Sequence, residues 1–229
     1  MRYLFIIVCL LLGFLEGSAQ EQNIKEIDSL YKEDQIYAGV TYNLLGNKPD
    51  DISQSGFSLG FHLGFIKDMP INKRRNVAIG LGLGYSANSF NQNLLINKEN
   101  NVITYDILAD SGTYSKNKFS SHLVEIPFEF RWRTSTATEY SFWRIYTGFK
   151  VGYMITHTTK YKGDLGTVKF SDIEGFNKFQ YGLTLSVGYN TWNLYLYYGL
   201  NPIFNENVVI ANEKLDMNSV KIGLVFYIL

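Results

Sequence analysis

The chain has 229 residues, and its 21 Lys and Arg residues balance its 21 Asp and Glu residues. This neutrality gives no electrostatic argument for nucleic acid, which we exclude as a partner. The single cysteine, Cys9, excludes an intramolecular disulfide and a site built from several thiolates.

Residues 1–19 have the pattern of a secretory signal peptide. Arg2 supplies the positive charge, residues 3–15 form an apolar run, and Gly-Ser-Ala at 17–19 is a small-residue cleavage site. The run is shorter than the ~20 residues that a membrane-spanning helix needs. We expect residues 20–34, which are polar and do not alternate, to form a periplasmic N-terminal segment.

Eight later segments alternate between large apolar residues and small or polar ones, as β-strands do when their two faces meet different surroundings. In VAIGLGLGY, residues 77–85, every second residue is large and apolar, and Ala or Gly stands between. The expected strands are 35–45, 55–67, 75–88, 121–133, 142–157, 178–190, 192–202 and 217–229.

The glycines indicate which face of these strands points inward. Thirteen of the 20 glycines fall in the expected strands, and each lies on the polar phase of the alternation. A small barrel in lipid directs its large apolar residues outward and its small and polar residues inward. The sequence therefore predicts an all-β, eight-stranded antiparallel up-and-down transmembrane β-barrel over residues 35–229. We expect Gly80→Ser to be mild, because this glycine is on the inward phase.

The connections between the expected strands alternate in length. Those at 67–75, 133–142 and 190–191 are short, whereas those at 89–120, 158–177 and 203–216 are long. Outer-membrane barrels have short periplasmic turns and long extracellular loops. The pattern predicts a barrel in the bacterial outer membrane, in contact with its lipid, with both termini in the periplasm. The sequence leaves the oligomeric state open.

Several charged residues fall on the inward phase, where a narrow lumen makes isolated charges costly. Glu125 is expected opposite Lys150 or one step away, and Glu129 near Arg144 or Tyr146. The full set of inward charges is Glu125, Glu129, Arg131, Arg144, Lys150 and Lys221. We interpret them as ion pairs that fill the barrel; a small channel with a proton or ion path is the alternative.

Catalysis and calcium binding are two other chemistries that the residue types could suggest. The three histidines are His62, His122 and His157, with Ser120, Ser121 and Glu125 near the second and third, and a barrel enzyme acting on lipid or peptide would need such groups to converge. Asp106 and Asp110 lack the dense oxygen ligands of a calcium loop, so we expect no metal there. We also expect no cofactor and no catalytic residue. Lys73, Arg74 and Arg75 form a basic turn that could dock a periplasmic partner or simply be solvated.

Three segments resemble a known family of barrels. HLVEIPFEFRWR (122–133) and the hairpin at 179–204 resemble strands of the outer-membrane β-barrel domain group that includes the PorT family. GFIKDMPINKRRNVAIGLGLGYSANSF (64–90) resembles the second and third strands of the PorT family itself. The resemblance implies a non-enzymatic outer-membrane component that supports type IX secretion, a gliding-associated route, with other secretion components as partners.

Overall fold

The computed structural model describes residues 33–100, 102–108, 113–134, 142–164, 166–210 and 213–228. The predicted signal peptide and residues 20–32 lie outside these ranges, so both remain predictions. Among the described residues, no helix is long and apolar enough to cross a membrane.

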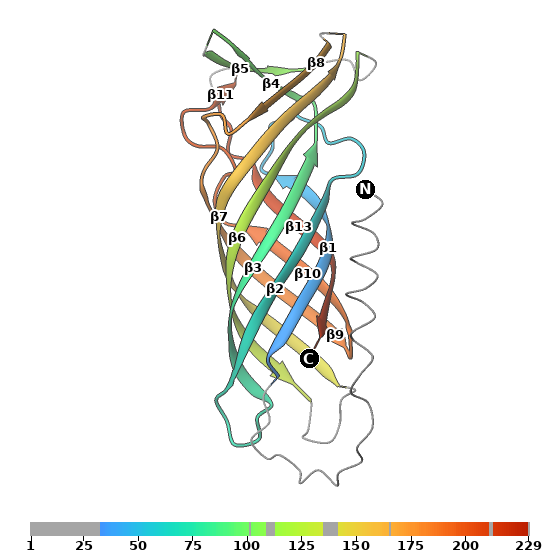
Figure 1. The fold of residues 1–229 in the computed structure, drawn as a ribbon, viewed down its shortest axis with the longest axis vertical. Coiled ribbons are helices and arrows are strands. Elements are labelled where there is room, and N and C mark those ends of the chain that lie inside the picture. The colour runs from blue at the N-terminus through green and yellow to red at the C-terminus, as the bar shows by residue number, and fades with distance from the viewer. Residues whose placement is uncertain are drawn as a thin grey trace, which may run out of the picture.

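Eight strands form one closed barrel (Figure 1). They are β1 (Gln35–Gly46), β2 (Leu59–Pro70), β3 (Val77–Asn91), β6 (Tyr114–Arg133), β7 (Trp143–Gly163), β9 (Phe179–Tyr189), β10 (Trp192–Gly199) and β13 (Asn218–Ile228). Each pairs antiparallel with the next along the chain, and β1 pairs with β13 to complete the circle. The predicted fold class is confirmed.

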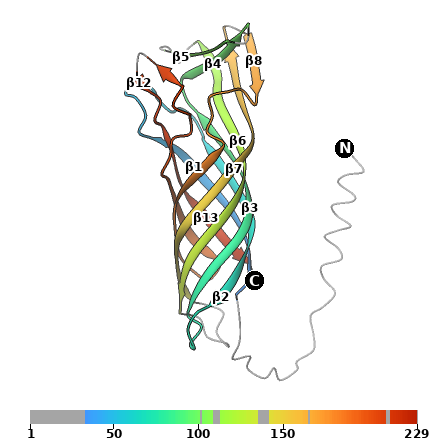
Figure 2. The same cartoon turned by 90° about the vertical axis from the view of Figure 1, so that its left-hand side faces the viewer.

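The two ends of the barrel differ in their connections (Figures 1 and 2). We call the end with the short connections 71–76, 134–142 and 190–191 the turn end; β1 begins and β13 ends there. The opposite end, here the loop end, carries two hairpins and one extra strand. These are β4 (Leu94–Glu99) with β5 (Val102–Ile107), β11 (Val209–Ile210) with β12 (Glu213–Lys214), and β8 (Gly166–Ser171) against β7.

The predicted loops 89–120 and 158–177 were wrong in large part, because they contain strand. β3 continues to Asn91, β6 already begins at Tyr114, and β7 reaches Gly163 before it pairs with β8. Here the alternation is among Ser, Thr, Lys and aromatic residues rather than between apolar and small ones. Apolar periodicity therefore did not mark these extensions.

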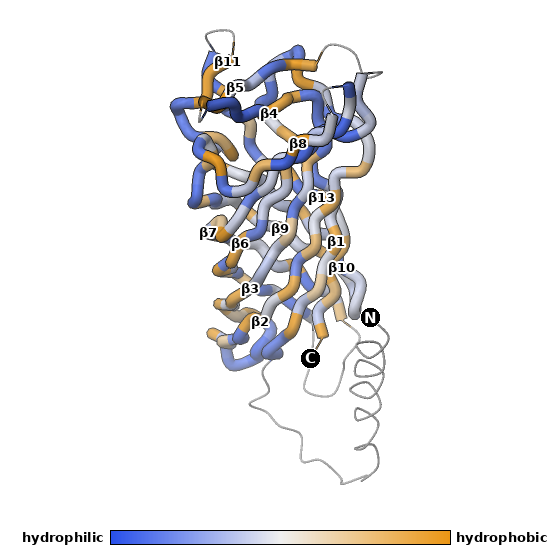
Figure 3. The backbone as a smooth tube through the Cα atoms, turned by 45° about the horizontal axis from the view of Figure 1, so that its top comes forward, coloured by the Kyte–Doolittle hydropathy of each residue, from blue (hydrophilic) through white to orange (hydrophobic). Residues whose placement is uncertain are grey.

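Side chains are sorted between the two faces as the glycine phase predicted. Outward residues such as Leu81 and Leu194 are 48% and 61% exposed. Figure 3 shows the same alternation along the strands, with hydrophilic residues gathered at the loop end. Inward tyrosines fill the space that glycines leave: Tyr37 lies against Gly64 and Gly84, where an added Cβ would stand within 2.6 Å of its ring and on its hydroxyl, respectively.

The expectation that Gly80→Ser is mild was wrong. A Cβ at Gly80 would lie 2.8 Å from Cδ of Arg131 and 2.9 Å from Cγ2 of Ile66, and both side chains are buried. Overpacking a filled interior forces neighbouring side chains out of their preferred rotamers. The glycine is needed because the Arg131 side chain passes over it, from β6 to Asp68 on β2.

We predict that Leu194→Arg destabilises the barrel in lipid, because it places a charge on the lipid face; such a charge costs about 2–4 kcal/mol at the bilayer midplane and less toward the interfaces. Reversible unfolding in lipid vesicles, followed by tryptophan fluorescence, measures this. Leu194→Val is the control and is expected to change stability little. Equal stability of the Arg and Val variants would mean that this face does not meet hydrocarbon.

Candidate functional site

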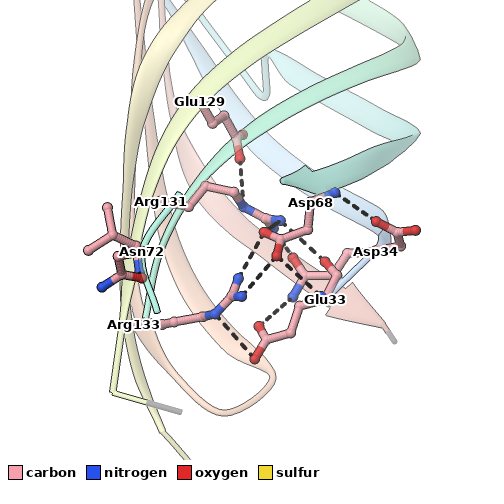
Figure 4. Close-up of polar contacts among 9 residues, drawn as sticks. Glu33, Asp34, Asp68, Asn72, Glu129, Arg131 and Arg133 are labelled. Carbon is pink, nitrogen blue, oxygen red and sulfur yellow. Dashed lines mark hydrogen bonds and ion pairs between the residues drawn. The ribbon is translucent and has the colours of Figure 1, made fainter. Parts of the chain in front are cut away.

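Asp68 is the centre of an ion network at the turn end (Figure 4). Its Oδ1 accepts a hydrogen bond from Nη1 of Arg131 at 2.8 Å, and Arg133 donates to both carboxylate oxygens at 2.8 Å each. Both arginines are 0% exposed. Bidentate, charge-assisted pairs of this kind are the strongest hydrogen bonds that proteins form between side chains.

Residues before β1 complete this network. Nε of Arg133 lies 3.5 Å from Oε1 of Glu33, and Nε of Arg131 lies 3.5 Å from Oε2 of Glu129. Arg131 also donates to the Glu33 carbonyl and to the side-chain oxygen of Gln35. The start of the described chain is thus bound across the lumen to β2 and β6 and closes the turn end.

A second polar cluster lies in the middle of the lumen around Glu125. Its Oε2 is 3.0 Å from Nζ of Lys150, and its Oε1 accepts a hydrogen bond from Ser86 at 2.7 Å. Lys150 also donates to the Tyr195 hydroxyl at 2.9 Å. Because every lysine proton and carboxylate lone pair in a dry core needs a partner, these contacts offset the cost of burying the pair.

Buried tyrosines separate the two clusters. The layer comprises Tyr37, Tyr146, Tyr195, Tyr197 and Tyr227. The guanidinium of Arg131 lies 4.2 Å from the ring centroid of Tyr146, a cation–π contact. Two lumen cavities measure about 20 and 10 Å³; Lys150 lines both, and the smaller one lies among Tyr37, Tyr195 and Tyr227. Such volumes hold at most about one water molecule, so the lumen is filled rather than open.

A buried apolar cluster, here the loop-end cap, closes the other end. Its centre is Phe119, whose ring centroid lies 4.9 Å from that of Phe90 and 5.6 Å from that of Phe204. Tyr105 packs edge-on against Phe204, and burial raises the pKa of Tyr105 to about 12. The remaining members are Leu45, Ile52, Leu94, Ile96, Leu123, Met154, Ile173, Phe176, Ile203, Val208, Leu215 and Met217.

The structure pairs Glu125 with Lys150 across β6 and β7, one step from direct opposition, since Lys150 is opposite Pro127. The register also places Glu129 one step from Tyr146, as the sequence predicted, because Tyr146 is opposite Arg131. Glu129 is opposite Gly148, and its ion-pair partner is Arg131 on the same strand. Arg144 instead stacks on Phe142, with its guanidinium 4.4 Å from the ring centroid.

Sequence reasoning missed Asp68 and Glu33, and it left Arg133 without a role. The expected second strand ended at residue 67, one position before Asp68. A signal was available, because residues 62, 64, 66 and 68 share the inward phase. Glu33 had no such signal, since it precedes the alternating region.

The three histidines do not converge. His62 faces the lumen, with Nε2 3.1 Å from the Thr41 hydroxyl, whereas His122 is bonded to Tyr85 on the outer face. His157 lies opposite Ser121, but its Nε2 is 2.9 Å from the Ile173 carbonyl and its Nδ1 is 3.8 Å from Asp172. A ring nitrogen that donates to a carbonyl cannot accept a proton from a serine.

The other predicted sites lie apart from the lumen. Asp106 lies in β5 and Asp110 outside the described residues; within the described part of the chain, no His, Cys, Asp and Glu cluster could hold a metal ion. In the basic turn, Lys73 and Arg74 are exposed and Arg75 is half-buried with a left-handed backbone, φ 55°. The turn is braced by a 2.6 Å hydrogen bond from Asn72 to Asn76.

Residues 18–205 match a family described as the outer membrane protein beta-barrel domain. Comparison with curated proteins finds no match.

Among solved structures, the chain is similar to Ail, the attachment invasion locus protein of Yersinia pestis, with 11% identity and a TM-score of 0.39 over 87% of this chain and 100% of that chain. Ail bound to the heparin analogue sucrose octasulfate has 14% identity and a TM-score of 0.38, over 87% of this chain and 100% of that chain. A mutant of Rh. blastica porin has 9% identity and a TM-score of 0.22, over 86% of this chain and 100% of that chain. Likeness of this degree carries no argument about function.

We predict that Asp68→Asn destabilises the barrel by about 3–5 kcal/mol, because it leaves two buried arginines without their shared carboxylate. Unfolding in lipid vesicles measures this. The control is Asp34→Asn, because the Asp34 side chain accepts the Asp68 backbone N–H at 2.7 Å and an amide oxygen can replace it. Similar stabilities for the two variants would show that the network does not hold the turn end closed.

Proposed function

The chain belongs to the outer membrane protein beta-barrel domain family and is an integral barrel of the bacterial outer membrane; we propose that it is non-enzymatic and supports type IX protein secretion through contacts of its loops and turns. A filled lumen supports the proposal that the barrel acts through contacts of its loops and turns. Ion networks, a tyrosine layer and the loop-end cap occupy the barrel from end to end. A role in protein export must then be carried by surfaces.

We propose that the turn end, with both chain ends, faces the periplasm and the loop end faces outward. The lengths of the connections support this orientation, because barrels of this kind keep their short turns on the periplasmic side. The basic turn of Lys73, Arg74 and Arg75 would then meet periplasmic components of a secretion machine. Its bracing by Asn72 and Asn76 presents the exposed charges in a fixed geometry.

The observation that carries the type IX assignment is the resemblance of residues 64–90 to strands of the PorT family, centred on the Pro-Ile-Asn-Lys turn. Ile71, Asn72 and Lys73 of that turn are exposed. Exposed turn residues contribute little to packing, so a resemblance there indicates a shared contact rather than a shared core. We propose other type IX components as partners of this turn.

We predict that deleting the gene traps type IX cargo in the periplasm, and that reversing the three turn charges (K73E, R74E and R75E together) reproduces part of the defect. Cargo in the medium and periplasm is measured by immunoblot. The control keeps the charge at the same positions (K73R, R74K, R75K) and is expected to secrete normally. Normal secretion by the deletion strain would refute the type IX role.

We also predict that His122→Ala and His157→Ala leave lipid A structure and outer-membrane proteolysis unchanged, because neither imidazole contacts a candidate nucleophile. Mass spectrometry of lipid A and peptide-cleavage assays with purified protein measure this. Loss of either activity in a variant that keeps its folded, heat-modifiable form would establish an enzyme instead.

A further inference from the structure

The outer surface of the barrel changes its chemistry at one level near the loop end. On β3 the outward side chains pass from Leu83 and Tyr85 to Ala87, Ser89 and Asn91. On β6 the polar part precedes Val124, and on β7 it follows Ile155, because the two strands run in opposite directions. Above the lipid-facing belt, the outer wall therefore becomes polar while the strands continue.

Five lysines occupy this polar wall in facing positions. Lys116 is opposite Lys162, and Lys118 is opposite Lys160, on β6 and β7. Lys160 is also opposite Lys169 of β8. Residues directly opposite in an antiparallel pair share one face, and like charges there destabilise the sheet. The arrangement has a cost in the isolated chain that an anionic ligand would remove.

A β-bulge at Ile155 places two of these lysines on the outer face. The register passes from His122 opposite Thr156 to Leu123 opposite Met154, so Ile155 has no partner. One extra residue reverses the inward and outward phases of everything beyond it. Without the bulge, Lys160 and Lys162 would point into the loop-end cap.

In the part of the chain that the structure describes, the lysine cluster has no ion-pair partner. Lys118 donates to the Ser89 hydroxyl at 3.2 Å. Two acids flank β8: Asp172 accepts the His157 backbone N–H at 3.0 Å, and Asp164 is exposed in the turn between β7 and β8. Hydroxyl donors surround the lysines: Ser120, Thr156, Thr158, Thr167 and Ser171.

A groove of about 460 Å³ leads from the lysines toward the lipid belt. Small residues of β3, Ala87 and Ser89, form its floor. Phe57, Leu59 and Phe61 form an exposed apolar wall, and Lys116, Lys118 and His122 form the other. Phe57, two residues before β2, is 81% exposed. The groove is apolar along one side and cationic at its upper end.

We propose that this surface binds lipopolysaccharide of the outer leaflet, with the lysines on the phosphates of lipid A and one acyl chain in the groove. The proposal rests on the orientation proposed above, in which the loop end faces outward. Phosphate fits because it accepts several hydrogen bonds and carries negative charge, which would neutralise the facing lysines. The apolar wall requires a ligand whose phosphate is joined to a hydrocarbon chain.

Binding is measured with the purified full chain in phosphatidylcholine nanodiscs, to which bisphosphorylated lipid A, the same lipid A without phosphates, or phosphatidylglycerol is added. The test variant carries K118Q, K160Q, K162Q and K169Q. The control carries K67Q, K73Q, R74Q and R75Q and loses the same charge at the turn end. Ala87→Trp fills the groove and leaves the lysines in place, and heat-modifiability confirms that each variant is folded.

We expect phosphorylated lipid A to bind about tenfold or more tightly than the dephosphorylated form. The test variant should lose this preference, the control should keep it, and Ala87→Trp should weaken binding. Equal binding of both lipid A forms, an unchanged preference in the test variant, or equal affinity for phosphatidylglycerol would overturn the proposal.

Orientation is read separately from Lys162→Cys in intact cells, with a membrane-impermeant maleimide. Labelling supports the lipopolysaccharide assignment, and labelling only after permeabilisation overturns it. Since binding is measured without secretion, failure here leaves the type IX test independent.

Discussion

Pairing of β1 with β13, from Ile36 opposite Ile228 to Gly46 opposite Asn218, joins the two ends of the sheet. In hydrocarbon no water is present to satisfy an open strand edge, and each unpaired backbone group costs several kcal/mol. Only a closed sheet can therefore direct residues such as Leu81 and Leu194 into lipid. The reversal of the usual sorting, apolar outside and polar inside, follows from this closure.

Closure with eight strands also fixes a narrow lumen, which side chains can just fill. The chain uses glycine on the inward phase to admit long residues from nearby strands, as Gly64 and Gly84 on β2 and β3 admit Tyr37 of β1. Charged groups in this space lie beside opposite charges or, as Arg144 and Lys221 do, over aromatic rings. Asp68 pairs with two arginines at once, and this lets one acid on β2 hold β6 and the residues before β1.

Fold class could be read from the sequence because lipid imposes a strict period of two on the membrane-spanning part. That constraint ends where the lipid ends, and beyond that level apolar alternation no longer predicted the bounds of the strands. The extensions of β6 and β7 alternate between cap residues such as Phe119 and polar residues such as Lys118, a pattern that resembles a loop in composition. The role of Glu33 depends on the chain folding back into the lumen, which no local pattern encodes.

The candidate site was partly visible for the same reason. Glu125 and Lys150 fall on the inward phase of neighbouring strands, so their proximity followed from the hairpin alone. The partner of Glu129 depended on the path of a long side chain, Arg131, which reaches toward β2 and passes Glu129 with its Nε 3.5 Å from Oε2. Register arguments place Cβ atoms, but they do not determine which of several nearby charges a flexible arginine meets.

The extensions of β6 and β7 form both the inner and the outer face of the wall at the loop end. Phe119 and Tyr161 on the inner face of β6 and β7 are buried in or beside the cap, while Lys118 and Lys160 lie back to back with them on the outer face. Packing of the inner residues holds the lysines in their facing positions despite repulsion. Because the lumen is filled, the rigid wall around it is what the barrel can offer to a ligand or partner. The bulge at Ile155, which sets the phase of the β7 extension, thereby decides the chemistry of its outer surface.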